Sequence, residues 1–402
     1  MRIVLVTAAA LGSACALAGA GLELREIPGQ APLGQVEIHG LAAGPFDPAN
    51  WRANRLNWSP DVRVPFIAPR RGGGFRNIYA PSVTREPYGW RLFYGAWDGV
   101  PTGNDRIYSV TTPDFVDFDD HATVIEHGVF IHVCNVNVQK LEDGSYHMIC
   151  TAYPDTRKQN KPIYFSSPDG RVWNGTPQPH VAAMPELVEV RGYDKYADAD
   201  LNGANVLLRD RGRWLLYFNN WKDPGKLYWA EGGHPKTFTL RGVALETNHA
   251  VNDVKRFHAG GKDWYVMGLH KNTSTLWYSL SNDGRRFEEP KVLFRQLYPE
   301  DKYIVAIGFA CQGDRLLGVI YGAGPVPELN RNRLFARWLQ KKVLLSGATE
   351  AGALGPDRQL LNLAGEKPLE GQMKVLAEDG ATPLASGPVK LRPGRIYQLT
   401  IR

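Results

Sequence analysis

The chain has 402 residues, a formal net charge of +6 and 22% charged residues, a length that suits two average domains or one large all-β domain. Its basic residues are scattered rather than arranged in a stripe with interleaved aromatic residues, which argues against nucleic-acid binding; the positive charge permits an anionic substrate without requiring one. Gly (42), Pro (28), Trp (11) and Tyr (17) are abundant and long helical patterns are missing, so we expect an all-β fold of short strands joined by turns.

Residues 1–20 have the pattern of a secretory signal peptide. Arg2 precedes a largely apolar run over residues 3–14, and small residues follow. This run is too short to span a bilayer, and no later stretch is apolar enough for a transmembrane helix. We therefore expect a secreted or periplasmic protein. Cys15 leaves a lipid anchor at the cell surface open, although Gly12 stands where a lipobox has an aliphatic residue.

The regions that flank the middle of the chain show no repeats. Residues 21–74 form an N-terminal extension with Pro-, Arg- and Gly-rich stretches, which we expect to pack across the first unit of the region that follows. Residues 346–402 contain short β-rich runs separated by Gly and Pro, and they predict a small C-terminal β appendage. This appendage either closes the central region or lies beside it.

Two sequence patterns recur between residues 75 and 345. In the first, an apolar strand is followed by a strand that opens with an aromatic residue, as Ala80–Val83 is followed by Trp90. In the second, an Asp-Gly turn is followed by an aromatic residue that can pack between neighbouring units. Further copies of the first pattern have Tyr146, Trp214 and Trp264 as the aromatic residue, and the second pattern occurs at 167–173 and 281–287.

Together the two patterns predict a four-stranded antiparallel unit that occurs five times. A single unit of this size cannot bury both faces of its sheet, so the units must stack, and radial closure is how small sheets achieve this. We therefore predict a five-bladed β-propeller over residues 75–345, with the recurring aromatic residues buried between blades. Its inner strands should begin near Tyr79, Asn135, Asn202, Asn252 and Val305.

The starts of these inner strands are rich in amide side chains. In a propeller the first strand of each blade lines the central channel, so residues at the strand starts converge at one mouth. Amides donate and accept hydrogen bonds with sugar hydroxyl groups, and aromatic rings stack on sugars. We predict a carbohydrate-binding mouth formed by Arg76, Asn77, Tyr79, Trp97, His132, Asn135, Asn137, Asn202, Asn205, Trp221, Asn252 and His270.

The Ala80-Pro81-Ser82-Val83 strand and the Ser-x-Asp-Gly-x-x-Trp element at 167–173 resemble the five-bladed β-propeller glycoside hydrolases. These are the arabinanases, xylosidases, levansucrases and invertases of families 43, 62, 32, 68 and 117. The resemblance covers the repeat region, and it implies an enzyme that hydrolyses a poly- or oligosaccharide. It also implies a base or nucleophile Asp in the first blade, a supporting Asp in the second and an acid Glu in the third.

This chain departs from the family pattern at all three of these positions, where it has Ala80, Asn135 and Asn202. Glycoside hydrolysis normally needs two carboxyl groups, one to protonate the leaving oxygen and one to activate water or attack carbon. Neither an amide nor a methyl group can do this work. We favour a hydrolase whose carboxylates have moved, with Asp253, Asp200 and Asp98 as the candidates, because each lies at a strand end or loop predicted to face the channel.

Two other functions remain open. In a lyase acting on uronate sugars, Arg76 or an Asn would neutralise the carboxylate while His132, His270 or Tyr79 takes the proton. In a non-catalytic glycan-binding propeller, the same mouth would only hold the sugar. The chain contains no phosphate-binding loop, nucleophile elbow or paired metal-ligand motif, so we expect no cofactor and predict no metal site.

Overall fold

The computed structural model describes residues 21–68, 77–97, 103–203, 205–328 and 331–402. Strands dominate these residues, with one short α-helix, α1 (Pro48–Ala53), and two 3-10 turns, Met184–Glu186 and Pro299–Asp301. The predicted all-β class is confirmed. In the described parts of the chain, no helix is long and apolar enough to cross a membrane. The predicted signal peptide lies outside the described residues.

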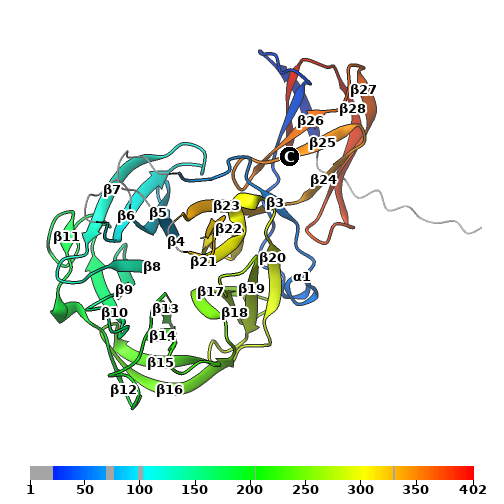
Figure 1. Ribbon diagram of the computed structural model, residues 1–402. Coiled ribbons are helices and arrows are strands. Elements are labelled where there is room, and N and C mark those ends of the chain that lie inside the picture. Colours follow the sequence, from blue (N-terminus) through cyan, green and yellow to red (C-terminus); the bar gives the residue numbers. More distant parts are fainter. Residues whose placement is uncertain (1–20, 69–76, 98–102, 204, 329–330) are drawn as a thin grey trace, which may run out of the picture.

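Five sheets lie around a common centre and form a ring (Figure 1). Their innermost strands are β4 (Ile78–Glu86), β8 (Val133–Lys140), β13 (Asn205–Asp210), β17 (Ala250–Ala259) and β21 (Tyr303–Gln312). Each of these inner strands contacts the inner strand of the next sheet along the chain, and β21 contacts β4, so the ring is closed. This is the propeller arrangement that the sequence repeats predicted.

Further strands extend each sheet outward, and strands that follow one another in the chain pair antiparallel. The second sheet has three strands rather than the four we predicted. The outer strands are β5 (Gly89–Ala96), β6 (Arg106–Thr112) and β7 (Asp119–Glu126) in the first sheet, β9 (Tyr146–Ala152) and β10 (Lys161–Ser167) in the second, β14 (Arg213–Asn219), β15 (Lys226–His234) and β16 (Thr237–Glu246) in the third, β18 (Lys262–His270), β19 (Thr275–Ser281) and β20 (Lys291–Arg295) in the fourth, and β22 (Arg315–Gly324), β23 (Arg333–Leu339) and β3 (Trp58–Pro60) in the fifth.

The chain that follows β10 explains why the second sheet is short. Instead of adding a fourth strand there, it forms β11 (His180–Val181), which pairs parallel with β7 of the first sheet. It then forms β12 (Glu189–Arg191), which pairs parallel with β16 of the third sheet. The segment therefore bridges the two sheets on either side of the second one.

A separate cluster of buried side chains fills the space between each pair of neighbouring sheets around the ring. Because each sheet is covered on both faces in this way, no unit is stable without its neighbours. The aromatic residues of both sequence patterns lie in these clusters, as predicted: Trp90, Tyr146, Trp214 and Trp264 from the second strands, and Trp173 and Phe287 after the Asp-Gly turns.

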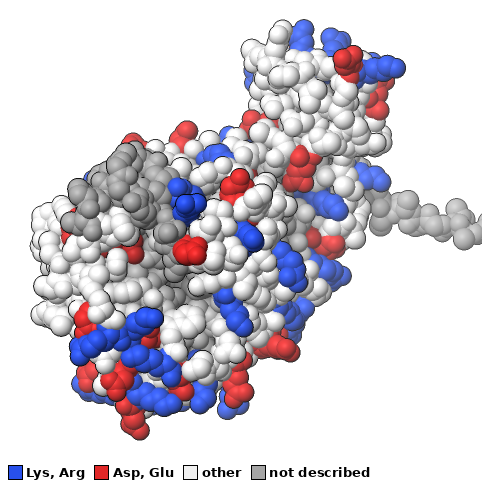
Figure 2. Space-filling model, in the orientation of Figure 1, with Lys and Arg blue, Asp and Glu red and all other residues white. Residues whose placement is uncertain are grey.

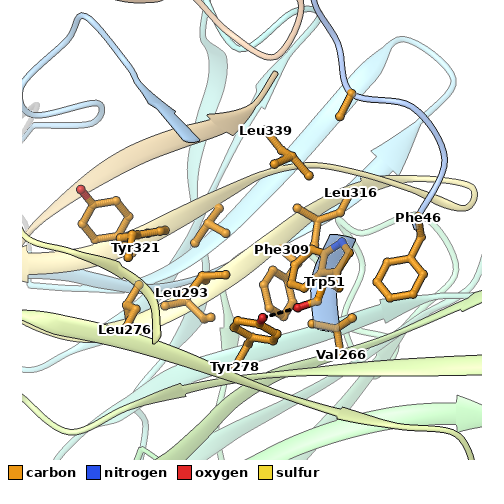
Figure 3. Packing of buried hydrophobic residues seen from close by; sticks show 14 of the residues in the cluster. Phe46, Trp51, Val266, Leu276, Tyr278, Leu293, Phe309, Leu316, Tyr321 and Leu339 are labelled. Carbon is orange, nitrogen blue, oxygen red and sulfur yellow. Dashed lines mark hydrogen bonds between the residues drawn. The ribbon is translucent and has the colours of Figure 1, made fainter. Parts of the chain in front are cut away.

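Helix α1 seals the outer edge of the cluster between the fourth and fifth sheets. Its Trp51 is buried against Tyr278, whose hydroxyl group donates a hydrogen bond to the Trp51 carbonyl oxygen (Figure 3). Phe46, just before the helix, stacks on Phe257 with ring centroids 4.8 Å apart. The N-terminal extension therefore contributes apolar surface to the ring far from the first sheet.

The C-terminal residues form a second unit of two sheets beside the ring (Figure 1). The two sheets share one apolar core, which includes Val36, Val375 and Leu399. One sheet consists of β1 (Leu22–Ile27), β29 (Ile396–Ile401), β2 (Gln35–His39), β26 (Arg358–Leu363) and β25 (Ala348–Ala353), and the other of β24 (Lys342–Leu345), β27 (Leu369–Leu376) and β28 (Pro383–Leu391).

The N-terminal extension is divided among three places rather than laid across the first sheet alone. Strands β1 and β2 complete the C-terminal unit, where β1 pairs with β29 and β2 pairs with β26 and β29. Strand β3 pairs with β23 in the fifth sheet. Phe66 and Ile67 pack in the cluster between the first and fifth sheets. At the other end, β24 already belongs to the C-terminal unit, so the ring ends with β23.

Candidate active site at the mouth of the ring

Irregular pairing marks the beginning of the inner strands. β-bulges interrupt the register at Ala80, Asn135, Asn252 and Val305, near the starts of β4, β8, β17 and β21. Ala80 and Asn135 have left-handed backbone conformations, with φ of 50° and 56°. A bulge bends its strand and redirects a side chain, and it commonly lies next to a binding site. Ala80 and Asn135 are two of the positions at which the sequence resemblance implies an Asp.

A cavity of about 610 Å³ opens at this end of the ring. A volume of this size suits one or a few sugar units and falls in the range of ordinary ligand sites. The loops between second and third strands reach it as well as the inner strands. Its lining consists of Tyr79, Ile131, His132, Asn135, Tyr153, Asp155, Thr156, Lys158, Asn160, Asp200, Asn202, Gly203, Trp221, His270, Asn272 and Val305.

Two residues of the cavity lining, Tyr79 and His132, form hydrogen bonds with Asp105, which does not itself line the cavity. The Tyr79 hydroxyl group donates to Oδ2 of Asp105 at 2.9 Å. The backbone N–H of Asp105 donates to Nδ1 of His132 at 3.0 Å, which leaves the ring proton of a neutral His132 on Nε2. Burial lowers the pKa of His132 and raises the pKa of Tyr79 well above its usual range. At neutral pH, His132 is therefore uncharged and Tyr79 keeps its proton.

Asp105 is the most unusual carboxyl group of this region. Burial raises its pKa from 3.8 to about 6, against the opposing effects of the Tyr79 hydrogen bond and Arg106. Its Oδ1 atom is buried and has no hydrogen-bond partner among the described residues. A buried carboxyl oxygen without a partner is costly, and such atoms occur preferentially at functional sites.

Other tyrosine–carboxylate pairs in the described part of the ring each include a cation. Tyr265 donates to Asp210 at 3.0 Å, and Asp210 forms an ion pair with Arg256 at 2.8 Å. No Lys or Arg of the described residues forms an ion pair with Asp105 within 4.0 Å, which is why burial dominates its pKa. The same three-part arrangement occurs at Tyr321–Asp301–Arg337, Tyr146–Glu86–Lys140 and Tyr228–Asp223–Lys195.

Asp200 contributes a carboxyl group to the cavity lining. It lies in the loop before β13 and is largely buried. Its Oδ1 atom accepts a hydrogen bond from the Asn160 side chain at 2.8 Å, and its backbone N–H donates to Oδ1 of Asn220 at 3.0 Å. These contacts hold the carboxylate in place, and the cavity lining includes both Asp200 and Asn160. This predicted residue is therefore at the mouth.

Amides and one exposed indole ring complete the lining. Asn202 Oδ1 accepts hydrogen bonds from Tyr153 and from the Asn135 side chain, the latter at 3.3 Å. The Trp221 indole N–H donates to the Asn202 carbonyl oxygen at 2.6 Å, while the residue remains 44% exposed. An indole anchored by its N–H and open on its face is suited to stacking on a sugar ring.

His270 also lines the cavity, but it is held in a neutral state. Burial lowers its pKa to about 3. Its Nδ1 atom lies 2.6 Å from Oδ1 of Asn252, a contact in which the ring donates and the amide oxygen accepts. Asn252 and Asn205 line a narrow adjoining cavity together with Asn135, so they border the mouth without facing its main volume.

The structure places several predicted residues elsewhere, and Asp253 is the main correction. Asp253 does not line the cavity; it is 1% exposed and accepts hydrogen bonds from Asn137, the Phe309 N–H and Lys255. Asn137 in turn accepts from the Leu207 N–H at 3.1 Å. The two side chains thus connect the inner strands β8, β13, β17 and β21, and Asp253, a predicted catalytic residue, lies outside the cavity lining.

Asn77 and Trp97 lie outside the cavity lining as well. Asn77 Oδ1 accepts from the Asn332 N–H at 3.3 Å, and its carbonyl oxygen accepts from the Trp97 N–H at 3.0 Å. The Trp97 ring packs closely on Gly103, where an added Cβ would lie 2.2 Å from a ring carbon. Asp98 and Arg76 lie outside the described residues. In the described part of the chain, no three His, Cys, Asp or Glu side chains are grouped as a metal site.

The sequence interpretation missed Asp105, Tyr153 and Asn160. It examined only the starts of inner strands. In an antiparallel sheet the third strand runs parallel to the first, so third strands also begin at the mouth. Asp105 directly precedes β6 and Asn160 directly precedes β10, and both are third strands of their sheets. A search of those positions would have found Asp105 and Asn160, whereas Tyr153 directly follows the second strand β9.

Comparisons with solved structures agree with the ring architecture at low sequence identity. A structure of the GH130 family of mannoside phosphorylases, described as containing glycoside hydrolases that target β-1,2 mannosidic linkages in Candida mannan, matches with TM-score 0.50 and 12% identity over 70% of this chain and 93% of that chain. The chain has the fold of these proteins.

Two further structures match equally well. They are a putative glycosidase from Bacteroides thetaiotaomicron, over 73% of this chain and 99% of that chain, and the catalytic domain of a Coprinopsis cinerea GH62 α-L-arabinofuranosidase, over 71% and 97%. Both have TM-score 0.50 and 12% identity. No protein-family model matches this chain, and no curated protein sequence does. The similarity to the glycoside hydrolase propellers predicted from the sequence is thus confirmed as a similarity of fold.

Proposed function

We propose that this protein is an exported glycoside hydrolase that cleaves a poly- or oligosaccharide in the mouth cavity. The fold, the sugar-sized cavity, the amide-rich lining and the exposed Trp221 ring support a carbohydrate ligand. The pattern of residues 1–20 supports export, with a lipid anchor at Cys15 still open. Because proteins of one fold carry out many reactions, the proposal depends on the residues of the site and not on the fold alone.

The Tyr79–Asp105 pair is the observation that carries this proposal. A general acid for glycoside hydrolysis needs a carboxyl group whose pKa is raised, so that it holds a proton near the working pH. Asp105 has a pKa of about 6 because it is buried without a cation partner. Tyr79 connects it to the cavity through a hydrogen bond of 2.9 Å. The pair can therefore deliver a proton to a bound substrate.

In the proposed hydrolysis, every proton that a residue gives up or takes is returned by the end of the cycle. Tyr79 gives its hydroxyl proton to the leaving glycosidic oxygen and receives the proton of Asp105, while the bond between the anomeric carbon and that oxygen breaks. Asp200 accepts a proton from the attacking water, whose oxygen bonds to the anomeric carbon. Transfer of a proton from Asp200 back to Asp105 through solvent restores the starting state. Two carboxyl groups thus share the work, as the reaction requires.

The chemistry of the pair favours a hydrolase over a uronate lyase. A lyase needs a base that removes a carbon-bound proton, but the pKa of Tyr79 is raised by burial and by the neighbouring Asp105. Burial lowers the pKa values of His132 and His270, which makes both imidazole rings weaker bases than an ordinary histidine. A non-catalytic binding site would gain nothing from a buried carboxyl group with an unpaired oxygen.

Incubation of the purified protein with a panel of neutral and uronate-containing plant and algal polysaccharides tests the proposal. We expect new reducing ends without new ultraviolet absorbance. Tyr79→Phe, Asp105→Asn and Asp200→Asn should each lower kcat/KM by at least about a hundredfold, the size expected for losing a general acid or base. The wild-type kcat/KM should fall as the pH rises through about 6, where Asp105 loses its proton.

Tyr265→Phe and Asp210→Asn are matched controls, because they make the same chemical changes in a tyrosine–aspartate pair that does not line the cavity. Both should keep kcat/KM within about threefold of wild type. Full activity in the Tyr79 and Asp200 variants would refute the assignment. An absorbing unsaturated product would show a lyase instead, and retention of a glycan without cleavage would show a binding protein.

A further inference from the structure

A second cavity of about 340 Å³ adjoins the mouth. It shares Trp221 and Asn272 with the mouth cavity, so the two spaces lie on either side of the same side chains. A glycan chain that passes over Trp221 would occupy both. The lining of this second cavity consists of Asn219, Asn220, Trp221, Pro224, Gly225, Lys226, Thr247, Asn248, Lys271 and Asn272.

The loop that carries Trp221 is firmly built. The Trp221 N–H donates to the Asp200 carbonyl oxygen at 2.9 Å, and the indole N–H donates to the Asn202 carbonyl oxygen. Asn220 accepts from the Lys222 N–H at 3.0 Å and donates to the Tyr193 hydroxyl group at 2.9 Å. The Trp221 indole ring, which lies between the two cavities, is therefore held by the backbone of residues that line the mouth. This favours a preorganised surface for stacking on a sugar.

The charge of the second cavity differs from that of the mouth. Lys226 and Lys271 line it, and its lining contains no Asp or Glu. Both lysines are exposed, and neither forms an ion pair within 4.0 Å with a described acidic residue. The nearest acidic group along the loop, Asp223, is instead paired with Lys195 at 2.9 Å and hydrogen-bonded to Tyr228. Glu246 lies opposite Lys226 in the β15–β16 ladder but does not line the cavity.

Charges on the surrounding surface point the same way. Figure 2 shows that Lys and Arg side chains gather, with several acidic ones, over the part of the ring that Figure 1 labels β10, β12 and β15. The third sheet, to which β15 belongs, supplies the Trp221 loop and Lys226. An anionic group approaching this side of the mouth meets the ammonium groups of Lys226 and Lys271, which form no ion pair within 4.0 Å with a described acidic residue, and such groups attract anions at moderate ionic strength.

We propose that the second cavity is a subsite for a sugar unit that carries an anionic substituent, either a uronate carboxylate or a sulfate ester. Lys226 and Lys271 bind the anionic group, Trp221 stacks on the sugar ring, and the Asn248 and Asn272 amides contact hydroxyl groups. This deepens the proposed function, since the glycan cut at the mouth would then be an acidic one. Binding at this subsite does not itself require that cleavage occurs.

Affinity electrophoresis of the full chain tests the subsite with chemically matched polymers. Polygalacturonate is compared with its carboxyl-reduced form, and ι-carrageenan with its desulfated form. We expect at least one acidic polymer to bind at least about tenfold more tightly than its neutral counterpart. Lys226→Gln together with Lys271→Gln should remove this tenfold preference and leave the affinity for the neutral polymer unchanged. Whichever pair shows the preference distinguishes a carboxylate from a sulfate as the anionic group.

Two controls separate the subsite from other effects. Lys367→Gln changes an exposed lysine in the connection between β26 and β27, away from the ring, and should leave the preference intact. Trp221→Ala should weaken binding of the acidic polymer and of its neutral form alike. Equal binding of acidic and neutral polymers by the wild type, or an undiminished preference in the double lysine variant, would overturn the proposal.

Failure of the subsite proposal can be distinguished from failure of the hydrolase proposal. If the acidic polymer is bound through the two lysines but no reducing ends appear, the subsite stands and the hydrolase proposal fails. If neutral glycans are bound and cleaved as well as acidic ones, and the double lysine variant is unchanged, the hydrolase proposal stands and the subsite proposal fails.

Discussion

The Tyr79–Asp105 and Tyr265–Asp210 pairs have the same chemistry but different surroundings. Both join a buried phenol to a carboxyl group by a hydrogen bond, of 2.9 and 3.0 Å. Asp210 also has Arg256 at 2.8 Å, whereas the second oxygen of Asp105 is buried without a partner among the described residues. The comparison indicates that a carboxylate with a cation partner holds the ring together, while the one without a partner is free to exchange a proton.

The largest effect is expected where a carboxylate with a cation partner is removed from the channel. Asp253 accepts hydrogen bonds from the Asn137 side chain of β8 and from the Phe309 N–H of β21. It also forms an ion pair at 3.1 Å with Lys255 of its own strand, β17. Asp253→Ala would leave these donors and a largely buried ammonium group without a partner. We expect a loss of about 3 kcal/mol or more in the free energy of unfolding, measured by urea denaturation.

Asp200→Ala provides the contrast for this measurement, since Asp200 lines the mouth cavity and its loss should cost roughly 1 kcal/mol. Equal destabilisation by both changes would contradict the division between channel carboxylates and mouth carboxylates.

A somewhat smaller effect concerns the pH dependence of stability. The folded-state pKa of Asp105 is about 6, above its ordinary value of 3.8, so the folded chain holds this proton more tightly than the unfolded chain does. Its contribution to stability is therefore greatest at low pH and is lost as the pH rises through about 4 to 6. The difference between the two pKa values corresponds to a loss of about 3 kcal/mol at most.

In Asp105→Asn this particular loss should disappear, so the variant should gain stability relative to wild type between pH 4 and pH 7. Urea denaturation at the two pH values provides the measurement. Asp210→Asn should show no such gain, because Arg256 loses its partner. If the stability of wild type and of Asp105→Asn changed with pH in parallel, the raised pKa of Asp105 in the folded chain would be contradicted.

The smallest effect is expected for an amide of the mouth. Asn135 can orient a sugar but cannot act as its acid or base, so Asn135→Ala should raise the Kd for a bound glycan about fivefold and leave kcat nearly unchanged. Asn135→Gly is the companion variant, because Asn135 has a φ of 56° that glycine adopts without strain.

Asn362→Ala, in the C-terminal unit, is the control for loss of an amide elsewhere and should leave the Kd unchanged. A hundredfold loss of kcat in Asn135→Gly would mean that this amide takes part in the chemistry, and the roles assigned to Tyr79 and Asp200 would have to be revised.

The repeats allowed much of the fold to be predicted because each one encodes its own packing. Trp90, Tyr146, Trp214 and Trp264 recur at the start of second strands, and each is buried between sheets. Local patterns did not reveal that the segment after β10 leaves the second sheet to form β11 and β12, because two- and three-residue parallel strands have no sequence period. They also did not reveal that β1 and β2 pair with strands more than 300 residues later.

The candidate site was predictable in part for a related reason. Tyr79, Asn135, Asn202, Asp200, Trp221, His132 and His270 were expected at the mouth, and all of them line its cavity. The strand ends at which they lie are visible in the sequence. Whether a given acidic residue near a strand end faces the cavity or bridges strands depends on the neighbouring sheets, and this is why Asp253, expected at the mouth, lies outside the cavity lining and why Asp105 was overlooked.

By itself, the sequence determined the all-β class, the repeating unit, the aromatic residues of the core and the end of the ring where polar side chains gather. These follow from side-chain periodicity and turn chemistry, which act over a few residues. Only the tertiary structure decided which carboxyl groups have a cation from another strand beside them, because Arg256 of β17 reaches Asp210 of β13, while no described Lys or Arg forms an ion pair with Asp105 within 4.0 Å. The proton affinity of a buried carboxyl group is set by these neighbours, and no local pattern records them.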